Sequence, residues 1–208
     1  AAAGVAYFGG RGMWGGGHDG SSGTNVMGYV TISSLGNASD FGDLTDNREA
    51  LGSCSGDARG IWCGGYNYSP NAIGDIIDYV TISTTGNATD FGDLTVARYN
   101  QPSAVSSGTR GVFGGGNSGS ASDVMDFVVI ASIGDATDFG DLTDGRQGSA
   151  AYSNGTRGVW HAGHDGTSNS DIIDYITIAS TGDATDFGNA VARGSGVAGC
   201  SNGTSGAA

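Results

Sequence analysis

The sequence predicts an all-β repeat protein, and three observations carry this prediction. Its 208 residues include 41 Gly, no Lys and a single Glu, so the stretches that helices need are missing. Thr, Val, Ile, Tyr and Phe instead occur in short runs bounded by Gly, Asn, Asp and Ser, as in short strands joined by tight turns. A phrase close to Thr-Asp-Phe-Gly-Asp-Leu-Thr recurs at 39–45, 89–95, 137–143 and, eroded, 185–190.

The repeats are regularly spaced. Each contains an Arg-Gly motif that precedes a Gly-rich turn, and these motifs begin at Arg11, Arg59, Arg110 and Arg157, so that the period is 48, then 51, then 47 residues. A period of this length is typical of solenoids, propellers and other repeat arrays. A repeated frame also argues against an enzyme, because a catalytic site breaks the symmetry of the repeats.

The third repeat shows which elements a unit contains. Small residues at 101–107 form a first strand, 110–114 a second that runs into three glycines, 124–131 a third and 137–143 a fourth. Four strands in about 48 residues are the content of one propeller blade.

The third strand of this unit predicts that its sheet is covered on both sides. Val124, Asp126, Val128 and Ile130 are expected on one face, and Met125, Phe127 and Val129 on the other. Apolar residues on both faces favour blades that stack face to face.

The periodicity divides the chain into four blades of one propeller domain. The blades are expected at 1–47, 48–97, 98–145 and 146–193, with 194–208 as the first strand of a further blade or as a closing strand. Such an edge invites association. The chain is either part of a larger ring, which we favour, or lends a strand to a neighbouring molecule, or closes with four blades and a spare tail.

The order of the strands resembles the kelch repeat of β-propellers. A small-residue strand precedes an aromatic strand that ends in Gly-Gly, then come a strand with Asp-Tyr, a strand with a central aromatic and Leu-Thr-x-x-Arg. The closing arginines of this pattern are Arg48, Arg98, Arg146 and Arg193. Two departures are that the tyrosine follows the aspartate and that Phe41, Phe91, Phe139 and Phe187 stand where kelch repeats usually carry Trp.

A longer string resembles a second group of proteins. The segment 77–95, Ile-Asp-Tyr-Val-Thr-Ile-Ser-Thr-Thr-Gly-Asn-Ala-Thr-Asp-Phe-Gly-Asp-Leu-Thr, is similar to repeat proteins of marine, especially cyanobacterial, phages. These are virion structural or tail-fibre components. The resemblance implies a virion or extracellular location, other virion proteins as partners and a possible homo-oligomer.

Charge and cysteine content narrow the class further. A net charge of −13 argues against binding to nucleic acid and to anionic membranes. No apolar run approaches the roughly 20 residues of a membrane span. Three cysteines give no disulfide framework; Cys54 and Cys200 share a repeat position and are expected to be small buried residues, and Cys54 could face Cys63 across a hairpin.

None of the motifs that could carry catalysis or hold a metal meets its requirements. The four Asp-Phe-Gly triplets do not indicate a kinase, because the chain has no lysine. The acidic series represented by Asp135, Asp138 and Asp141 offers oxygens to Ca²⁺, but residues three apart on a strand point to opposite faces. The histidines, at 18, 161 and 164, lie in two groups without a zinc-ligand pattern. We therefore expect no catalytic residues, no metal site and no cofactor, with structural calcium as the minor alternative.

The loops after the Gly pairs are the predicted binding face. They span 17–25, 66–75, 117–123 and 162–171, and they vary in length on an otherwise near-identical frame. Aromatic rings with Asn and Asp acceptors suit stacking on and hydrogen bonding to sugars, which makes a host surface glycan the expected ligand. The candidate ligand-binding residues are His18, Asp19, Tyr66, Tyr68, Asn117, His164 and Asp165.

Several functions remain open at this point. The loops could be no more than tolerant surface turns, in which case the protein is a capsid-decoration or fibre segment without a ligand. A secreted bacterial surface adhesin is a further alternative, and a galactose-oxidase-like enzyme comes last.

Overall fold

The computed structural model describes residues 10–56, 58–68, 70–100 and 102–201. None of these residues forms a helix that is long and apolar enough to cross a membrane. The strands are β1 (Arg11–Gly15), β2 (Thr24–Thr31), β3 (Ser39–Glu49), β4 (Gly52–Ser55), β5 (Arg59–Cys63), β6 (Tyr66–Asn67), β7 (Ala72–Ile73), β8 (Ile76–Thr81), β9 (Thr89–Asp93), β10 (Ser103–Ser106), β11 (Arg110–Gly114), β12 (Val124–Val129), β13 (Thr137–Asp141), β14 (Ala150–Ser153), β15 (Arg157–His161), β16 (Ser170–Thr177) and β17 (Thr185–Gly194).

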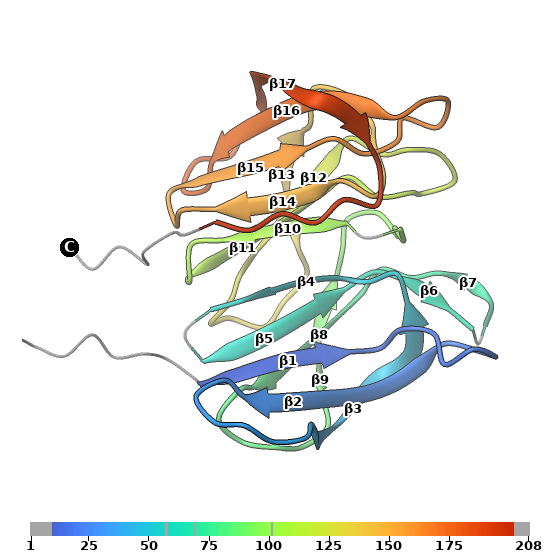
Figure 1. Cartoon of the computed structure of the whole chain (residues 1–208), viewed down its shortest axis with the longest axis vertical. Helices are drawn as coiled ribbons and strands as arrows, with labels where there is room; N and C mark the ends of the chain where they lie inside the picture. Colours follow the sequence, from blue (N-terminus) through green and yellow to red (C-terminus); the bar gives the residue numbers. More distant parts are fainter. Residues whose placement is uncertain (1–9, 57, 69, 101, 202–208) are drawn as a thin grey trace, which may run out of the picture.

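The strands form four antiparallel sheets that follow one another along the molecule in chain order (Figure 1). The second, third and fourth sheets have the orders β4-β5-β8-β9, β10-β11-β12-β13 and β14-β15-β16-β17. The first sheet combines β1-β2-β3 with the short hairpin β6-β7, which pairs with the end of β3. The expected small-residue strand before Arg11 falls on residues 1–9, outside the described part of the chain. The all-β, blade-like architecture that the repeats predict is confirmed.

A β-bulge occurs at the same place in every sheet. The register shift lies between the last two strands of each repeat, which are β2 and β3 in the first sheet. It occurs at Met27/Gly28, Ile77/Asp78, Met125/Asp126 and Ile173/Asp174. The extra residue on the partner strand is the recurrent phenylalanine, for example Phe139, and the glycine after it has a φ of 131° that favours glycine. The alternation predicted for 124–130 is confirmed. Val128 and Ile130 pack against the second sheet, on the side where Asp126 pairs with Arg98, while Met125 and Phe127 pack against the fourth sheet.

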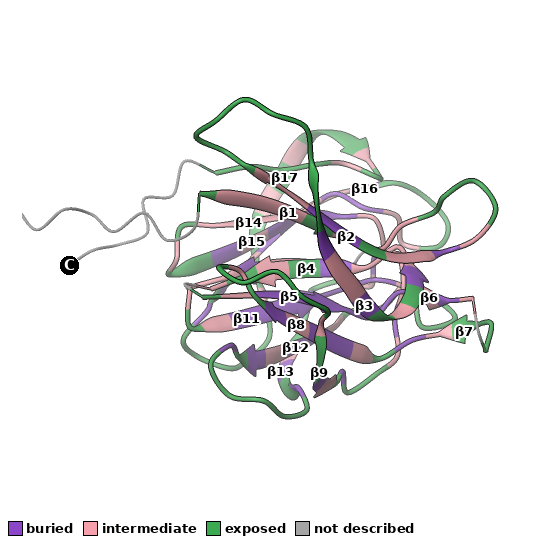
Figure 2. Ribbon diagram, turned by 90° about the horizontal axis from the view of Figure 1, so that it is seen from below, coloured by how far each residue is buried: buried purple, intermediate pink, exposed green. Residues whose placement is uncertain are grey.

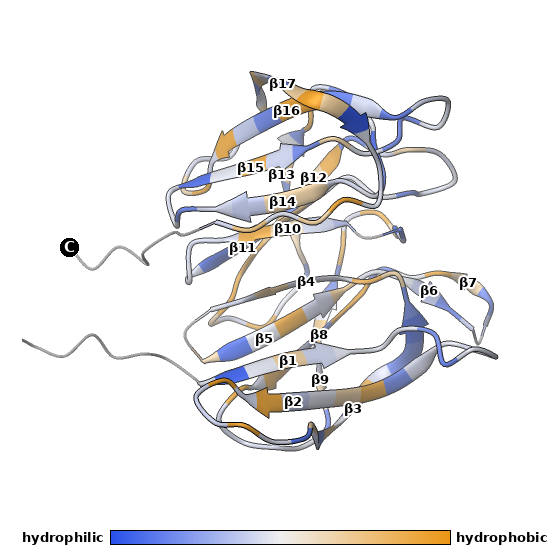
Figure 3. Ribbon diagram, viewed as in Figure 1, coloured by the Kyte–Doolittle hydropathy of each residue, from blue (hydrophilic) through white to orange (hydrophobic). Residues whose placement is uncertain are grey.

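The core lies between neighbouring sheets. Phe41 and Leu44 of the first sheet pack on Trp62 and Val80 of the second. The same arrangement recurs twice, as Phe91 with Phe113 and as Phe139 with Trp160 in the next two clusters. Figure 2 shows buried segments on the strands and exposed residues on the connecting loops, and Figure 3 shows hydrophobic segments along the same strands. Burying each such large side chain contributes about 1.5–3 kcal/mol.

The cysteines differ in part from expectation. Cys63 is buried, and its loss of solvation raises the pKa of the thiol to about 12. Cys54 lies opposite Ile61 rather than Cys63 in the hairpin, and both thiols are free. Cys54 and Cys200 are both expected to be buried, but Cys54 is half-buried and Cys200 is exposed. Its segment lies along β14, where the Ser201 hydroxyl donates to the Ser153 carbonyl at 2.6 Å, but no further described sheet covers it.

Candidate ligand-binding end

In the second, third and fourth repeats, the first residue of the variable loop pairs with the preceding sheet. His18, Tyr66, Asn117 and His164 occupy this repeat position. Tyr66 pairs with Glu49, Asn117 with Tyr99 and His164 with Gln147, each partner being the residue that follows a closing arginine. Backbone pairing therefore brings the second, third and fourth variable loops to one end of the molecule, and the first loop joins them through the contact of the His18 ring with Tyr68. We call this surface the loop end and define it by His18, Tyr66, Tyr68, Tyr99, Asn117, Gln147 and His164.

Aromatic rings form one half of the loop end. Tyr66 lies edge-on to Tyr68 with 5.7 Å between ring centroids, and Tyr99 lies 5.8 Å from Tyr66 on the other side. The His18 ring is 5.8 Å from that of Tyr68. The Tyr68 hydroxyl donates to Glu49 Oε1 at 3.0 Å; desolvation, that hydrogen bond and the nearby carboxylate raise the pKa of the phenol. The rings of His18, Tyr68 and Tyr66, which come from two loops, thus join Tyr99 in a continuous row. The three tyrosines of this row are half-buried and His18 is exposed.

Amide groups form the other half. Gln147 Oε1 accepts hydrogen bonds from Asn100 Nδ2 at 2.7 Å and from Asn117 Nδ2 at 2.8 Å. Beside them lies a pocket of about 440 Å³. Its lining residues are Ala50, Asn100, Gln147, Gly148, His164, Ser195 and Gly196.

The two predicted aspartates cap their own loops. Asp19 Oδ1 accepts from the Ser21 and Ser22 amides at 2.8 and 2.9 Å, and Asp165 Oδ1 accepts from the Thr167 and Ser168 amides, both at 2.7 Å. The amide hydrogen bonds, from Ser22 and then Ser21, lower the pKa of Asp19 to about 2, and those from Ser168 and Thr167 lower the pKa of Asp165. These carboxylates shape the loops.

The preceding histidines are fixed in the same way. His18 Nδ1 accepts from the Gly20 amide and His164 Nδ1 from the Gly166 amide, both at 3.0 Å. When neutral, each ring therefore carries its proton on Nε2. That nitrogen is the atom through which either histidine can donate to a ligand.

Two residues of the loop end, Tyr99 and Gln147, are not among the predicted ones, and neither is Asn100, which donates to Gln147. The signal that could have found them is position, because each lies one or two residues after a closing arginine. The segment after the arginine turns where it lines the pocket, with φ of 55° at Ala50 and 57° at Asn100. The loop residues and these turn residues together make the surface.

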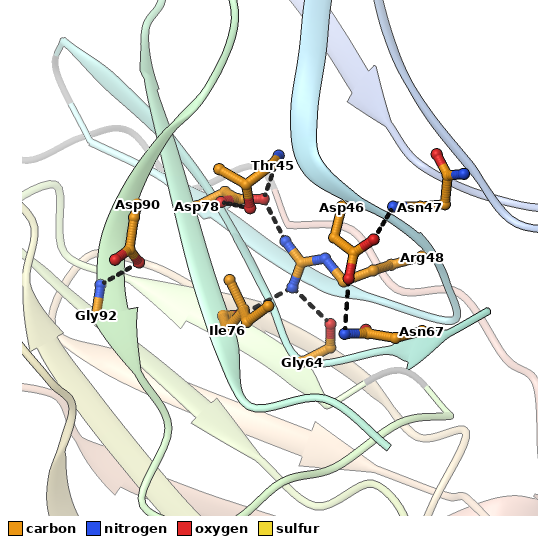
Figure 4. Close-up of polar contacts among 10 residues, drawn as sticks. All are labelled: Thr45, Asp46, Asn47, Arg48, Gly64, Asn67, Ile76, Asp78, Asp90 and Gly92. Carbon is orange, nitrogen blue, oxygen red and sulfur yellow. Dashed lines mark hydrogen bonds and ion pairs between the residues drawn. The ribbon is translucent and has the colours of Figure 1, made fainter. Parts of the chain in front are cut away.

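The closing arginines have a different role. Arg48 is fully buried, forms an ion pair with Asp78 of the second sheet and donates to the carbonyls of Gly64 and Ile76 at 2.9 and 2.8 Å (Figure 4). Thr45 Oγ1 donates to the other Asp78 oxygen at 2.6 Å. The pairs Arg98–Asp126, at 2.8 Å, and Arg146–Asp174 repeat this contact at the next two junctions. The sequence shows both motifs, Asp-Tyr and the closing arginine, but not that they meet.

The Asn or Asp that follows the recurrent turn glycine forms a hydrogen bond to the preceding sheet. Asn87, Asp135 and Asp183 each accept, through Oδ1, the backbone amide of a residue in the preceding sheet, from Asp43, Asp93 and Asp141, all at 3.1 Å. His161 packs on the Tyr152 ring at 5.6 Å. Within the described ranges, no three His, Cys, Asp or Glu side chains are arranged to hold a metal ion.

Comparison with known proteins places the fold. No family model matches the chain, and no curated protein matches it. The solved structure of YjhT, a kelch-type propeller, is similar with a TM-score of 0.75 over 95% of this chain and 73% of that chain, at 10% sequence identity. At this identity the likeness concerns the fold alone. The chain has the fold of a kelch-type β-propeller, built here from four blades.

Proposed function

We propose that the protein is a non-enzymatic component of a phage virion whose loop end binds a glycan on the host surface. The long string at 77–95 supports the virion assignment through its resemblance to phage repeat proteins. A lysine-free chain of net charge −13 suits a soluble protein that meets neither nucleic acid nor an anionic membrane.

The contiguity of the loop end is the observation that carries the binding function. His18, Tyr68, Tyr66 and Tyr99 follow one another at ring separations of 5.7–5.8 Å. The row continues to Asn117, which pairs with Tyr99 and hydrogen-bonds Gln147. A sugar presents an apolar C–H face and a rim of hydroxyls, so it needs an aromatic face beside amide donors and acceptors. The loop end offers both on a rigid scaffold.

Replacing both exposed-loop tyrosines tests this function. Tyr66→Ala/Tyr68→Ala removes two neighbouring rings, and we expect at least an approximately tenfold loss of affinity for host cells, as for aromatic hot-spot residues. Fluorescently labelled protein titrated onto host cells gives the measurement. Tyr152→Ala, which removes another half-buried tyrosine from the inner strand β14, is the matched control and should bind normally.

Unchanged binding by the double variant would contradict a ligand at the loop end. Binding by neither the wild type nor the variants would favour a purely structural decoration or fibre segment.

A further inference from the structure

Each junction between neighbouring sheets is built from the same contacts. At the first, Arg11 Nη1 donates to the Ile82 carbonyl at 2.6 Å, and the Gly86 amide donates to the Phe41 carbonyl at 2.7 Å. The Asp43 amide also donates to Asn87 Oδ1. The second and third junctions repeat this set; their arginine contacts are Arg59 to Ile130 at 2.8 Å and Arg110 to Ile178 at 3.1 Å. At every junction, the earlier sheet thus contributes the face with the arginine and the phenylalanine, which we call the donating face. The next sheet contributes the face with the isoleucine carbonyl and the Gly-Asn or Gly-Asp turn, which we call the receiving face.

The fourth sheet carries a donating face that no described residue covers. Phe187 is 54% exposed, whereas Phe41, Phe91 and Phe139 are 2% exposed or less. Arg157 stacks on Tyr175, as Arg110 does on Phe127. Among the described residues, however, no following sheet offers Arg157 a carbonyl like that of Ile178, which accepts from Arg110. A Cβ on Gly140 would collide with the backbone of the fourth sheet's loop, whereas one on Gly188 would meet nothing within 4 Å.

The first sheet carries the matching receiving face, also open. Trp14 is 47% exposed, although its counterpart Trp62 is only 5% exposed. Ile32 is 71% exposed, whereas Ile178 at the same repeat position is fully buried. The segment 36–38, Gly-Asn-Ala, repeats the Gly-Asn-Ala of 86–88 that binds the first sheet, and it is exposed in full.

We propose that these two faces bind each other between copies of this chain, so that the fourth sheet of one copy docks head to tail on the first sheet of a second. Phe187 would be covered by Trp14 and Ile32, as Phe139 is by the fourth sheet. Arg157 would donate to the Ile32 carbonyl, and the Asn37 side chain would accept the Asn189 amide. Residues 195–201 continue the hydrogen bonds that link the first strands of successive repeats. The Gly196 amide donates to the Gly148 carbonyl at 2.8 Å, as the Gly148 amide does to the Asn100 carbonyl.

The buried ion pair of the internal junctions has no counterpart here. Gly28 stands where the other sheets carry Asp78, Asp126 and Asp174, and the Trp14 ring lies over it. Arg193 is one residue closer to its phenylalanine than the other closing arginines, and it pairs with Asp171 of its own sheet at 3.7 Å on the surface. Both halves of the pair are lost together, so docking leaves no partner aspartate buried without its arginine.

Two single-face variants test the proposal. Trp14→Arg disables the receiving face and Phe187→Arg the donating face, and Val129→Arg, at an exposed site of the third sheet, is the control. Light scattering after gel filtration should show a wild-type mass above the 20.6 kDa monomer that rises with concentration. Each face variant should weaken association by about thirtyfold or more, as loss of a central aromatic contact does. Circular dichroism verifies that both variants fold.

Mixing the variants gives the decisive result. Trp14→Arg keeps an intact donating face, and Phe187→Arg keeps an intact receiving face, so the two variants can bind each other. An equimolar mixture should form dimers and nothing larger, because the two faces left free in such a heterologous dimer are the substituted ones. Raising the salt concentration should strengthen wild-type association, since each copy carries −13. A monomeric wild type, a mixture that stays monomeric, or a face variant that associates as the wild type does would overturn the proposal. The tyrosines at 66 and 68 lie on neither face, so loop-end binding is judged separately.

Discussion

Asp78 is the residue on which the first junction depends most. It receives the guanidinium of Arg48 and the Thr45 hydroxyl, and both ionic side chains are fully buried. Asp78→Asn leaves the arginine charge without its counter-ion, and we expect a loss of about 3–5 kcal/mol in the free energy of unfolding. Denaturation by urea, followed by tryptophan fluorescence, measures this loss.

Asp90→Asn is the matched control for this change. Asp90 is exposed on β9 and accepts only the Gly92 amide at 3.1 Å. The free energy of unfolding should change by no more than about 0.5 kcal/mol. If the two substitutions lowered the free energy of unfolding equally, the buried Arg48–Asp78 pair would not be the interaction on which the junction depends.

Ala50, which lines the pocket, has an unfavourable backbone conformation. Its φ is 55°, and the equivalent residues include Gly148 and Gly196 with φ of 61° and 62°. A left-handed conformation costs an L-residue about 1–2 kcal/mol, so Ala50→Gly should stabilise the protein by about 0.5–1 kcal/mol. The same substitution at Ala151, within β14, should instead destabilise it. A fall in the urea midpoint for Ala50→Gly would contradict this explanation.

The sequence identified the residues of the site better than their partners. The four loop positions could be found because they break an otherwise regular repeat. Gln147 could not, because its importance comes from two hydrogen bonds across sheets, to Asn100 and Asn117. Asp19 and Asp165 stay predicted ligand-binding residues, and the structure adds that each caps its own turn, as an exposed aspartate before Gly does.

The loop between β1 and β2 is the element whose order should depend on pH. In the folded protein the pKa of Asp19 is lowered from 3.8 to about 2, because the Ser22 and Ser21 amides bind the charged carboxylate. This contribution is complete above the ordinary carboxyl pKa and is lost as the pH falls toward 2. The Ser22 amide resonance should therefore titrate near pH 2, and a midpoint near pH 4 would contradict the capping role. Asp19→Asn should abolish the transition.

Strands were more predictable than their registers. Composition and period placed all four strands of the third repeat correctly, since β10 to β13 lie within the segments expected for them. The bulge could not be foreseen, because Phe139 looks like any strand aromatic, and only the partner strand reveals the extra residue. The strand pattern also does not show that Asp126 is fully buried, because its partner Arg98 comes from the preceding repeat.

At the scale of the whole molecule, the repeat explains both why neighbouring sheets bind each other and why the two end sheets each keep an exposed face. Each sheet buries one face against the previous sheet and the other against the next, so the sheets at the two ends of a four-sheet array keep an open face. Trp14 and Phe187 mark these faces. The sequence indicates four repeats and an edge open to association. That the two end faces match each other could be inferred only from the structure, which shows that their residues are exposed.

The central claim is that this chain is a virion component that meets the host, and its location tests this most directly. Immunogold labelling with an antibody to this chain should be applied to purified phage particles and to uninfected host cells. The proposed function predicts gold on the particles, concentrated at the fibre tips. Gold spread over the head would contradict host attachment and favour decoration, and gold only on uninfected cells would contradict the virion assignment and indicate a bacterial surface adhesin.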